Sequence, residues 1–279
     1  RRRVAGERGH DVTVLEAADQ PGGQIRLTAL SERRREMISI IDWRMAQCER
    51  LGVKFHFNTW AEADTVQAFE PDVVIVATGG LPDTEVLSKG NELVVSTWDI
   101  ISGDIKPGRN VLIFDDAGDH AALQAAEVIA QSGATVEIVT PDRSFAPEVM
   151  AMNLVPYMRS LQDLDVTFTV TYRVDTVEKR DGGLVATFGS DYGKVHKQRV
   201  VDQVVVNHGT LPLDDLYFEL RPLSTNGGAV EQHDLIAGTA QNIVTNPEGR
   251  FQLFRIGDAV SARNTHAAIY DALRLVKEI

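Results

Sequence analysis

Three short segments, far apart in the sequence, carry residues that could bind a nucleotide. Glu16 follows a run of β-forming residues, and Pro21-Gly22-Gly23-Gln24 comes shortly after it. Gly257-Asp258 ends another such run. A carboxylate at the carboxyl end of a strand can accept hydrogen bonds from ribose hydroxyls, and paired glycines let backbone amides approach a ligand closely. The three segments together predict a nucleotide-binding site.

Each segment also has a plainer interpretation when it is taken alone. Glu16 could be a surface acid after a strand, the glycines an ordinary turn, and Asp258 the cap of a helix. A fourth segment favours the binding site. Thr78 and Gly79 close a buried strand expected over 72–77, and their order and spacing relative to the other three are typical of one nucleotide site.

Strands and helices must position these residues. The order of the strand-like and helix-like segments along the sequence predicts an α/β fold. Short β-branched runs alternate with helical patterns, which is typical of parallel sheets covered by helices. One nucleotide-fold unit ends at Glu16. A second begins with a strand over 110–116, followed by a helix over 121–132 and a strand over 135–140. Between 166 and 206 the alternation predicts antiparallel strands.

The first unit is expected to be truncated at its N-terminal strand. The sequence opens with the end of a helix, a turn at Gly9 and a strand over 11–15, the second half of a βαβ unit. A first strand and a glycine-rich phosphate turn should precede that helix. We therefore expect a piece of a longer polypeptide, whose first sheet lacks the central strand between 11–15 and 72–77.

Composition excludes several classes of function. The chain of 279 residues has 43% apolar and 24% charged residues and a net charge of −12, which argues against nucleic-acid or anionic-membrane partners. Cys48 is the only cysteine, so no internal disulfide or cysteine-ligated cluster can form within these residues, and a reducing, cytoplasmic location is expected. The seven histidines lack metal-ligand spacing, so no metal site is predicted.

The motifs resemble those of a known family. The segments GHDVTVLEA, PGGQ, VVIVATGG and RIGDA are similar to those of glutathione-reductase-like flavoproteins with two dinucleotide-binding domains. More narrowly, all 279 residues resemble the C-terminal region of the multidomain Old-Yellow-Enzyme-related NADH:flavin oxidoreductases. That group includes 2,4-dienoyl-CoA reductases, trimethylamine, dimethylamine and histamine dehydrogenases, and N-methylproline demethylase-like proteins.

The resemblance implies two Rossmann-like domains, of the FAD-binding and NAD(P)-binding kinds. Residues 1–86 and 222–279 would form a discontinuous domain for FAD or ADP, and residues 87–221 an inserted NAD(P)-binding-like domain. The family pattern implies the following cofactor-binding residues: Glu16, Gly22, Gly23, Gln24, Thr78, Gly79, Gly257 and Asp258.

The same resemblance places the chemistry outside this chain. An upstream TIM barrel with FMN and a 4Fe-4S cluster would carry the catalytic residues, so none is assigned here and this region alone is expected to be inactive. The implied partners are that barrel, a separate electron acceptor and a second copy in a homo-oligomer. The implied activity is that of a flavin-dependent oxidoreductase, an amine dehydrogenase or N-demethylase. An NAD(P)H:flavin reductase module and a noncatalytic structural domain stay open as alternatives.

The inserted domain departs from the family pattern. Its G-x-G-x-x-G positions hold Ala117, Asp119 and Ala122, so an acid replaces the middle glycine. Two unit charges about 4 Å apart repel by roughly 1 kcal/mol in water and roughly 4 kcal/mol near a protein surface. NAD(P)H binding is therefore not expected, with Arg143 as the one nearby cation to offset the charge. Asp119 could equally serve as a helix cap. The basic run 33–35 is interpreted as a solvated face.

Overall fold

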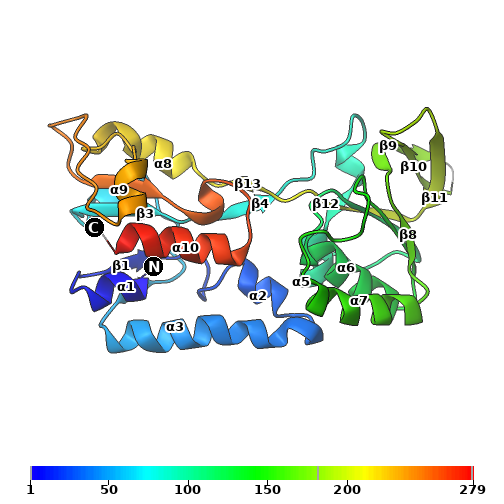
Figure 1. Ribbon diagram of the computed structural model, residues 1–279, viewed down its shortest axis with the longest axis horizontal. Coiled ribbons are helices and arrows are strands. Elements are labelled where there is room, and N and C mark those ends of the chain that lie inside the picture. Colours follow the sequence, from blue (N-terminus) through cyan, green and yellow to red (C-terminus); the bar gives the residue numbers. More distant parts are fainter. Residues whose placement is uncertain (1, 181, 278) are drawn as a thin grey trace. The chain divides into compact units, whose positions relative to one another are not determined.

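The structure of the protein, a computed structural model, describes residues 2–180, 182–277 and 279 (Figure 1). The chain divides into two compact units. The first comprises Arg1–Ile25, Met37–Leu81 and Thr210–Ile279, and the second Arg26–Glu36 and Pro82–Gly209. The second unit thus takes in the short stretch 26–36 besides the inserted segment, because Leu27 packs against its hydrophobic core.

The first unit contains two separate pairs of parallel strands. Strand β1 (Thr13–Leu15) pairs with β2 (Lys54–His56), and β3 (Val73–Val76) pairs with β14 (Gln252–Arg255). Among the described residues, no backbone ladder joins β1 to β3. The expectation that these two strands are not paired with each other is confirmed.

Helices complete the first unit around these strands. The longest are α3 (Ser39–Arg50) and α10 (Thr265–Val276), and Asn264 caps α10 by accepting a hydrogen bond from the backbone N–H of Ala267 at 2.9 Å. α10 buries Ala272 and Leu275 against Phe254 of β14. The other helical segments there are α1 (Arg2–Glu7), α2 (Gln24–Thr28, which continues into the second unit), α4 (Ala63–Gln67), α8 (Asp215–Leu220), η3 (Arg221–Leu223), α9 (Gln232–Ala237) and η4 (Gly257–Ala259).

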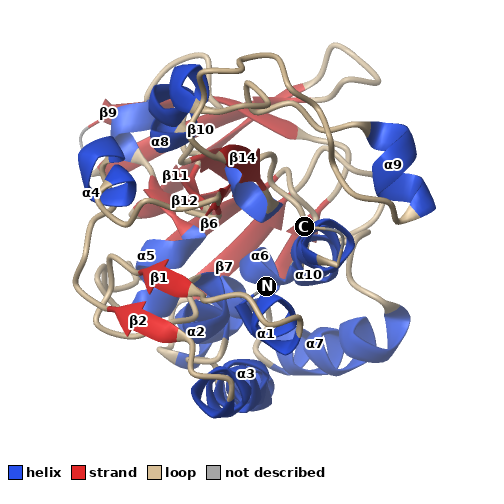
Figure 2. Ribbon diagram, turned by 90° about the vertical axis from the view of Figure 1, so that its left-hand side faces the viewer, coloured by secondary structure: helices blue, strands red, loops and turns tan. Residues whose placement is uncertain are grey.

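The second unit is built on a five-stranded sheet in the order β5-β12-β6-β7-β8, with every neighbouring pair parallel. Figure 2 shows β12, β6 and β7 side by side. The strands are β5 (Val95–Ser96), β6 (Asn110–Asp115), β7 (Thr135–Val139), β8 (Thr167–Thr169) and β12 (Gln203–Asn207). The helical segments are η1 (Glu32–Ile38, which runs into the first unit), η2 (Asn91–Leu93), α5 (Thr97–Ser102), α6 (His120–Gln131) and α7 (Ala151–Asp163).

A separate antiparallel sheet follows, in the order β11-β10-β9. It contains β9 (Arg173–Arg180), β10 (Gly183–Gly189) and β11 (His196–Val201). The prediction of antiparallel strands throughout 166–206 is therefore wrong at both ends. β8 and β12 join the parallel sheet, because their pairing depends on β7 and β6, which lie far away in the sequence.

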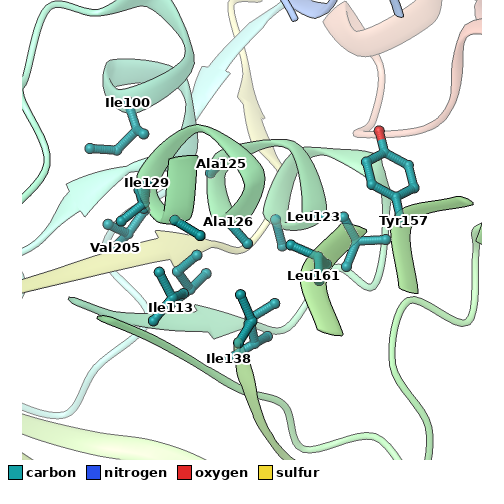
Figure 3. Packing of buried hydrophobic residues seen from close by; sticks show 14 of the residues in the cluster. Ile100, Ile113, Leu123, Ala125, Ala126, Ile129, Ile138, Tyr157, Leu161 and Val205 are labelled. Carbon is teal, nitrogen blue, oxygen red and sulfur yellow. The ribbon is translucent and has the colours of Figure 1, made fainter. Parts of the chain in front are cut away.

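The core of the second unit lies between α6 and its sheet (Figure 3). Ala125, Ala126 and Ile129 are buried on the helix, and the small alanines let it lie close to Ile113 and Ile138 on the strands. Burial of each large aliphatic side chain contributes roughly 1.5–3 kcal/mol. This packing fixes the start of α6 relative to the end of β6.

Two of the points where the chain passes between the units lie at segments that pair with each other, β4 (Gly80–Pro82) and β13 (Thr210–Pro212). A Cβ at Gly80 would lie 2.6 Å from the carbonyl oxygen of Leu211, so the pairing requires glycine there. None of the helices in the described part of the chain is long and apolar enough to cross a membrane.

Candidate functional site

The carboxyl ends of β3 and β14 place two predicted segments at the same edge of one strand pair. Val76 and Arg255 are register partners, and the backbone N–H of Ile256 donates to the carbonyl of Val76 at 3.1 Å. Thr78 and Gly257 therefore follow the ends of adjacent parallel strands. In open α/β sheets this edge is where ligands bind.

The glycine pair opens α2 in backbone conformations that favour glycine. Gly22 has φ 135° and Gly23 has φ 49°. A Cβ built on Gly23 would meet no atom within 4 Å, so the space beside this turn is open. The turn requires glycine for its backbone, and it leaves room for a ligand close to its amides.

Gln24 and Asp258 form the contact that joins two of the predicted segments. The Nε2 of Gln24 donates a hydrogen bond to Oδ2 of Asp258 at 2.8 Å, across 234 residues of sequence. Both side chains are partly buried. The second carboxylate oxygen of Asp258 can accept from a ligand hydroxyl, because a carboxylate has about four acceptor positions.

The other predicted residues have local partners. One carboxylate oxygen of Glu16 accepts from the backbone N–H of Ala18 at 3.2 Å, which orients the side chain at the end of β1. Thr78 donates its hydroxyl to the carbonyl of Leu213, and Gly79 adopts φ 80°. This hydrogen bond links the segment that follows β3 to the segment that follows β13. The Thr78 hydroxyl is used in that contact, so a role for Thr78 toward a ligand would rest on its backbone.

Asp271 is a residue of this site that sequence reasoning missed. Its carboxylate accepts from the backbone N–H of Gly257 at 3.4 Å and pairs with Arg263 and Arg274. Burial alone would raise the pKa of Asp271, but the hydrogen bond and charge of Arg263, together with the hydrogen bonds from Gly257 and Arg274, lower the pKa below its ordinary value. Asp271 lies within α10, where no strand end or glycine marks it, so only the folded structure shows its role.

In the second unit, the turn after β6 is occupied by the chain's own carboxylates. Asp119 is the N-cap of α6, and its Oδ1 accepts from the backbone N–H of Ala121 at 2.8 Å. Asp115, 2% exposed, accepts from the backbone N–H of Gly118 at 2.9 Å. Asn207 donates its side-chain amide to both acids, at 2.9 and 3.0 Å. The interpretation of Asp119 as a helix cap is confirmed.

These contacts use the groups that a phosphate would need. The backbone N–H groups of Asp116 and Ala117 both donate to the carbonyl of Asn207, at 2.9 and 3.2 Å. Burial raises the pKa of Asp115 to about 7, against the hydrogen bonds of Asn207 and Gly118 that lower it. An anion at this turn would therefore meet carboxylates, and backbone amides that already have hydrogen-bond partners.

The basic side chains beside this turn differ from the predicted one. Arg143 was the expected partner, but the structure places Arg173 and His208 against Asp116, each with a nitrogen 2.9 Å from Oδ2. Arg173 comes from β9 and His208 from the segment after β12. Arg143 follows β7 in the sequence, and nearness along the chain is the only basis for expecting it there. Within the described residues, no group of three or more His, Cys, Asp or Glu could hold a metal ion.

Comparison with known proteins shows relatives that cover nearly all of this chain. It is 76% identical over 277 residues to a "Probable N-methylproline demethylase" of Rhizobium meliloti, covering 99% of this chain and 41% of the relative. It is 42% identical to an N,N-dimethylglycine/sarcosine dehydrogenase of Chromohalobacter salexigens, with the same two coverages. It is 35% identical to a multifunctional alkene reductase/demethylase OYE of Caballeronia cordobensis, covering 98% of this chain and 41% of the relative.

Solved structures support the fold. Histamine dehydrogenase from Rhizobium sp. 4-9 matches with a TM-score of 0.81 and 22% identity, covering all of this chain and 41% of that one. Thioredoxin reductase of Lactococcus lactis matches with a TM-score of 0.65 and 15% identity, covering 99% of this chain and 92% of that one. A scan against protein-family models found no match.

These similarities support a relationship to the Old-Yellow-Enzyme-related flavin oxidoreductases and an α/β fold with glutathione-reductase-like structural neighbours. The chain spans about two fifths of the length of these three curated relatives.

Proposed function

We propose that this chain is the nucleotide-binding region of a flavin-dependent amine dehydrogenase or N-demethylase. A 76% identical relative named for N-methylproline demethylation supports this choice. The full-length protein would carry FMN and a 4Fe-4S cluster in an upstream TIM barrel, and electrons would leave to a separate acceptor. An N-methylated amino acid is the substrate class that the names of the first two relatives suggest.

The observation that carries the nucleotide site is the hydrogen bond between Gln24 and Asp258. It joins two segments that the sequence alone singled out, at the carboxyl edge of β3 and β14. The residues fit FAD or ADP, because the open space at Gly23 admits a ligand and the carboxylates of Glu16 and Asp258 can accept from its hydroxyls.

The inserted unit would be a structural remnant that does not bind NAD(P)H. Asp119 and Asp115 occupy the turn where a pyrophosphate would meet backbone amides. A reductase that accepts hydride from NADPH needs those amides. A reductase function is the second candidate, because one relative is named as a multifunctional alkene reductase/demethylase. That function would require NADPH to bind at this turn.

Mass spectrometry of the full-length protein after denaturation tests the first unit. We expect one equivalent of FAD or ADP beside FMN, and protein without either nucleotide would contradict the proposal. Anaerobic addition of N-methylproline tests the reaction, with flavin bleaching and formaldehyde release as the expected result. Bleaching by NADPH but not by any N-methylated amino acid would instead establish the reductase.

A further inference from the structure

The stretch of residues 26–36, which we name the arm, is held by the second unit although the chain on both sides of it belongs to the first. Its neighbours Ile25 and Met37 lie in the first unit, whereas the arm lies in the second. Helix α2 crosses this boundary, because it begins at Gln24 and ends within the arm. The helix that carries a predicted nucleotide-binding residue is thus continuous with a segment of the other unit.

α2 has little of its own to hold it in place. The helix is five residues long, and none of its residues is buried. Helices this short are not stable by themselves in water. The turn before it contains Gly22 and Gly23, and glycine has the greatest backbone freedom of all residues. Contacts at the two ends of α2 must therefore determine where this turn lies. At its start, Gln24 donates to Asp258 at 2.8 Å.

The end of α2 is held by a buried amide of α6. Gln124, 2% exposed, donates its Nε2 to the carbonyl of Thr28 at 2.9 Å and to Oγ of Ser31 at 2.7 Å. Thr28 is the last residue of α2, and its carbonyl is one of those that the helix itself cannot satisfy. Leu27 also packs against the hydrophobic core that includes α6. Gln124 therefore fixes the carboxyl end of α2 on the second unit.

A second anchor follows in η1. Arg33, interpreted from the sequence as part of a solvated face, instead forms a two-pronged ion pair with Glu127 of α6, and that interpretation is wrong for this residue. The Glu127 side chain is 7% exposed. The Arg33 guanidinium also lies over the ring of Tyr157, 4.7 Å from its centroid. The arm therefore carries a cation to a buried acid of the second unit.

The two anchors act together on one face of α6. Gln124 and Glu127 are three residues apart on this helix, so their side chains lie side by side. A buried amide or carboxylate is costly unless it is hydrogen-bonded, and the arm supplies hydrogen-bond partners to both. Detachment of the arm would leave both groups without these partners. The attachment is therefore favoured strongly enough to restrain α2.

We propose that Gln124 and Glu127 are positioning residues for the nucleotide site, because they hold the arm and, through α2, the glycine turn before Gln24. This inference rests on the proposed nucleotide site of the first unit. By linkage, a nucleotide that binds more tightly to the held turn must in return strengthen the attachment of the arm to α6. The inserted unit would thus support nucleotide binding without a nucleotide site of its own.

Release of FAD or ADP from the purified full-length protein tests the proposal, followed by chromatography of the filtrate after dilution. Gln124→Leu should release the nucleotide about tenfold faster than the wild type, because two hydrogen bonds to the arm are lost. Glu127→Gln should release it about fivefold faster, since the charge of the pair is lost, and the milder Ser31→Ala about threefold faster. The control Gln131→Leu, which replaces an exposed glutamine of the same helix, should match the wild type.

Two readouts separate positioning from general destabilisation. If Gln124 acts through α2, then Gln124→Leu should add little to the faster release of Gln24→Ala, whereas independent effects would add fully. In the wild type, hydrogen exchange over 26–36 should be slower with the nucleotide bound than after its removal. This second measurement needs no variant.

The outcomes distinguish this inference from the proposed function. Wild-type release rates in Gln124→Leu, Glu127→Gln and Ser31→Ala would overturn the inference and leave the nucleotide site intact. Full additivity with Gln24→Ala would overturn it as well, as would equal exchange of the arm with and without nucleotide. A full-length wild type that carries neither FAD nor ADP would overturn the proposed nucleotide site, and this inference with it. Ser31→Ala and the exchange measurement keep the test decisive even if Gln124→Leu fails to fold.

Discussion

The buried acid Asp115 should make the stability of the second unit depend on pH. Its folded pKa is about 7 against an ordinary value of 3.8, because burial penalises the carboxylate. A raised folded pKa means that the unfolded chain ionises first as pH increases. The contribution of Asp115 to stability is thus fully present below about pH 4 and falls until about pH 7.

The variant Asp115→Asn isolates this contribution. The hydrogen bonds to the side chain from the Gly118 backbone amide and the Asn207 side-chain amide both reach Oδ1, and asparagine retains one such oxygen. Each pKa unit corresponds to about 1.4 kcal/mol. Between pH 5 and pH 8, integration of the two titrations gives a loss of about 3 kcal/mol in the wild type that the variant avoids.

Hydrogen exchange of the full-length protein, followed by mass spectrometry, measures the effect. The opening free energy of α6 is compared between the two proteins from pH 5 to pH 8, after correction for intrinsic exchange rates. His120 titrates in the opposite sense, because its pKa is lowered to about 4. The difference between wild type and variant cancels that contribution. Parallel pH profiles would refute the reasoning, and the exposed Asp163→Asn serves as control.

Three further predictions concern the other contacts. NADPH should not bleach the flavin of the full-length protein under anaerobic conditions. Rapid stoichiometric bleaching that disappears in Asp119→Arg would restore a reductase function. Arg33→Met should destabilise the second unit by about 2–4 kcal/mol in hydrogen exchange, because Glu127 is left buried and unpaired, and the double variant with Glu127→Met should recover most of that loss. Asp258→Ala should release the bound nucleotide on gel filtration, and Gln24→Ala should weaken its binding about tenfold, which equilibrium dialysis can measure. Full retention in both variants would contradict the site.

The sequence predicted those features that depend on neighbouring residues. Glycine pairs and acids at strand ends are local signals, so the turn at Gly22 and Gly23 and the cap at Asp119 could be read directly. It also predicted that β1 and β3 would not pair. Alternation alone could not assign β8 and β12 to a parallel sheet. β8 lies at the edge of that sheet, where an exposed parallel strand can alternate just as an antiparallel strand does, and only its partner distinguishes the two. β12 is an interior strand, and its buried run over 204–206 is typical of a parallel strand, a signal that the alternation around it obscures.

The sequence also did not predict which residues pair with the charged side chains. The ion pair of Arg33 joins residues 94 positions apart, and the amide of Asn207 reaches Asp115 across 92 positions. No periodicity relates such residues, because their contact is set by how η1 and β12 meet the elements next to them. A run of arginines therefore reads as a solvated face even where one of its members is bound to a buried acid.

The two units use acids at strand ends in opposite ways. In the first unit, the space beside Gly23 is open and Asp258 keeps acceptor capacity beyond its bond to Gln24. In the second, Asp115 and Asp119 bond the amides of their own turn, and one side-chain amide bridges both. A turn whose donors are already bonded gains nothing from a phosphate and repels its charge. We therefore expect one bound dinucleotide or ADP per full-length protein, in the first unit, and a stoichiometry of two would show that the turn after β6 can open.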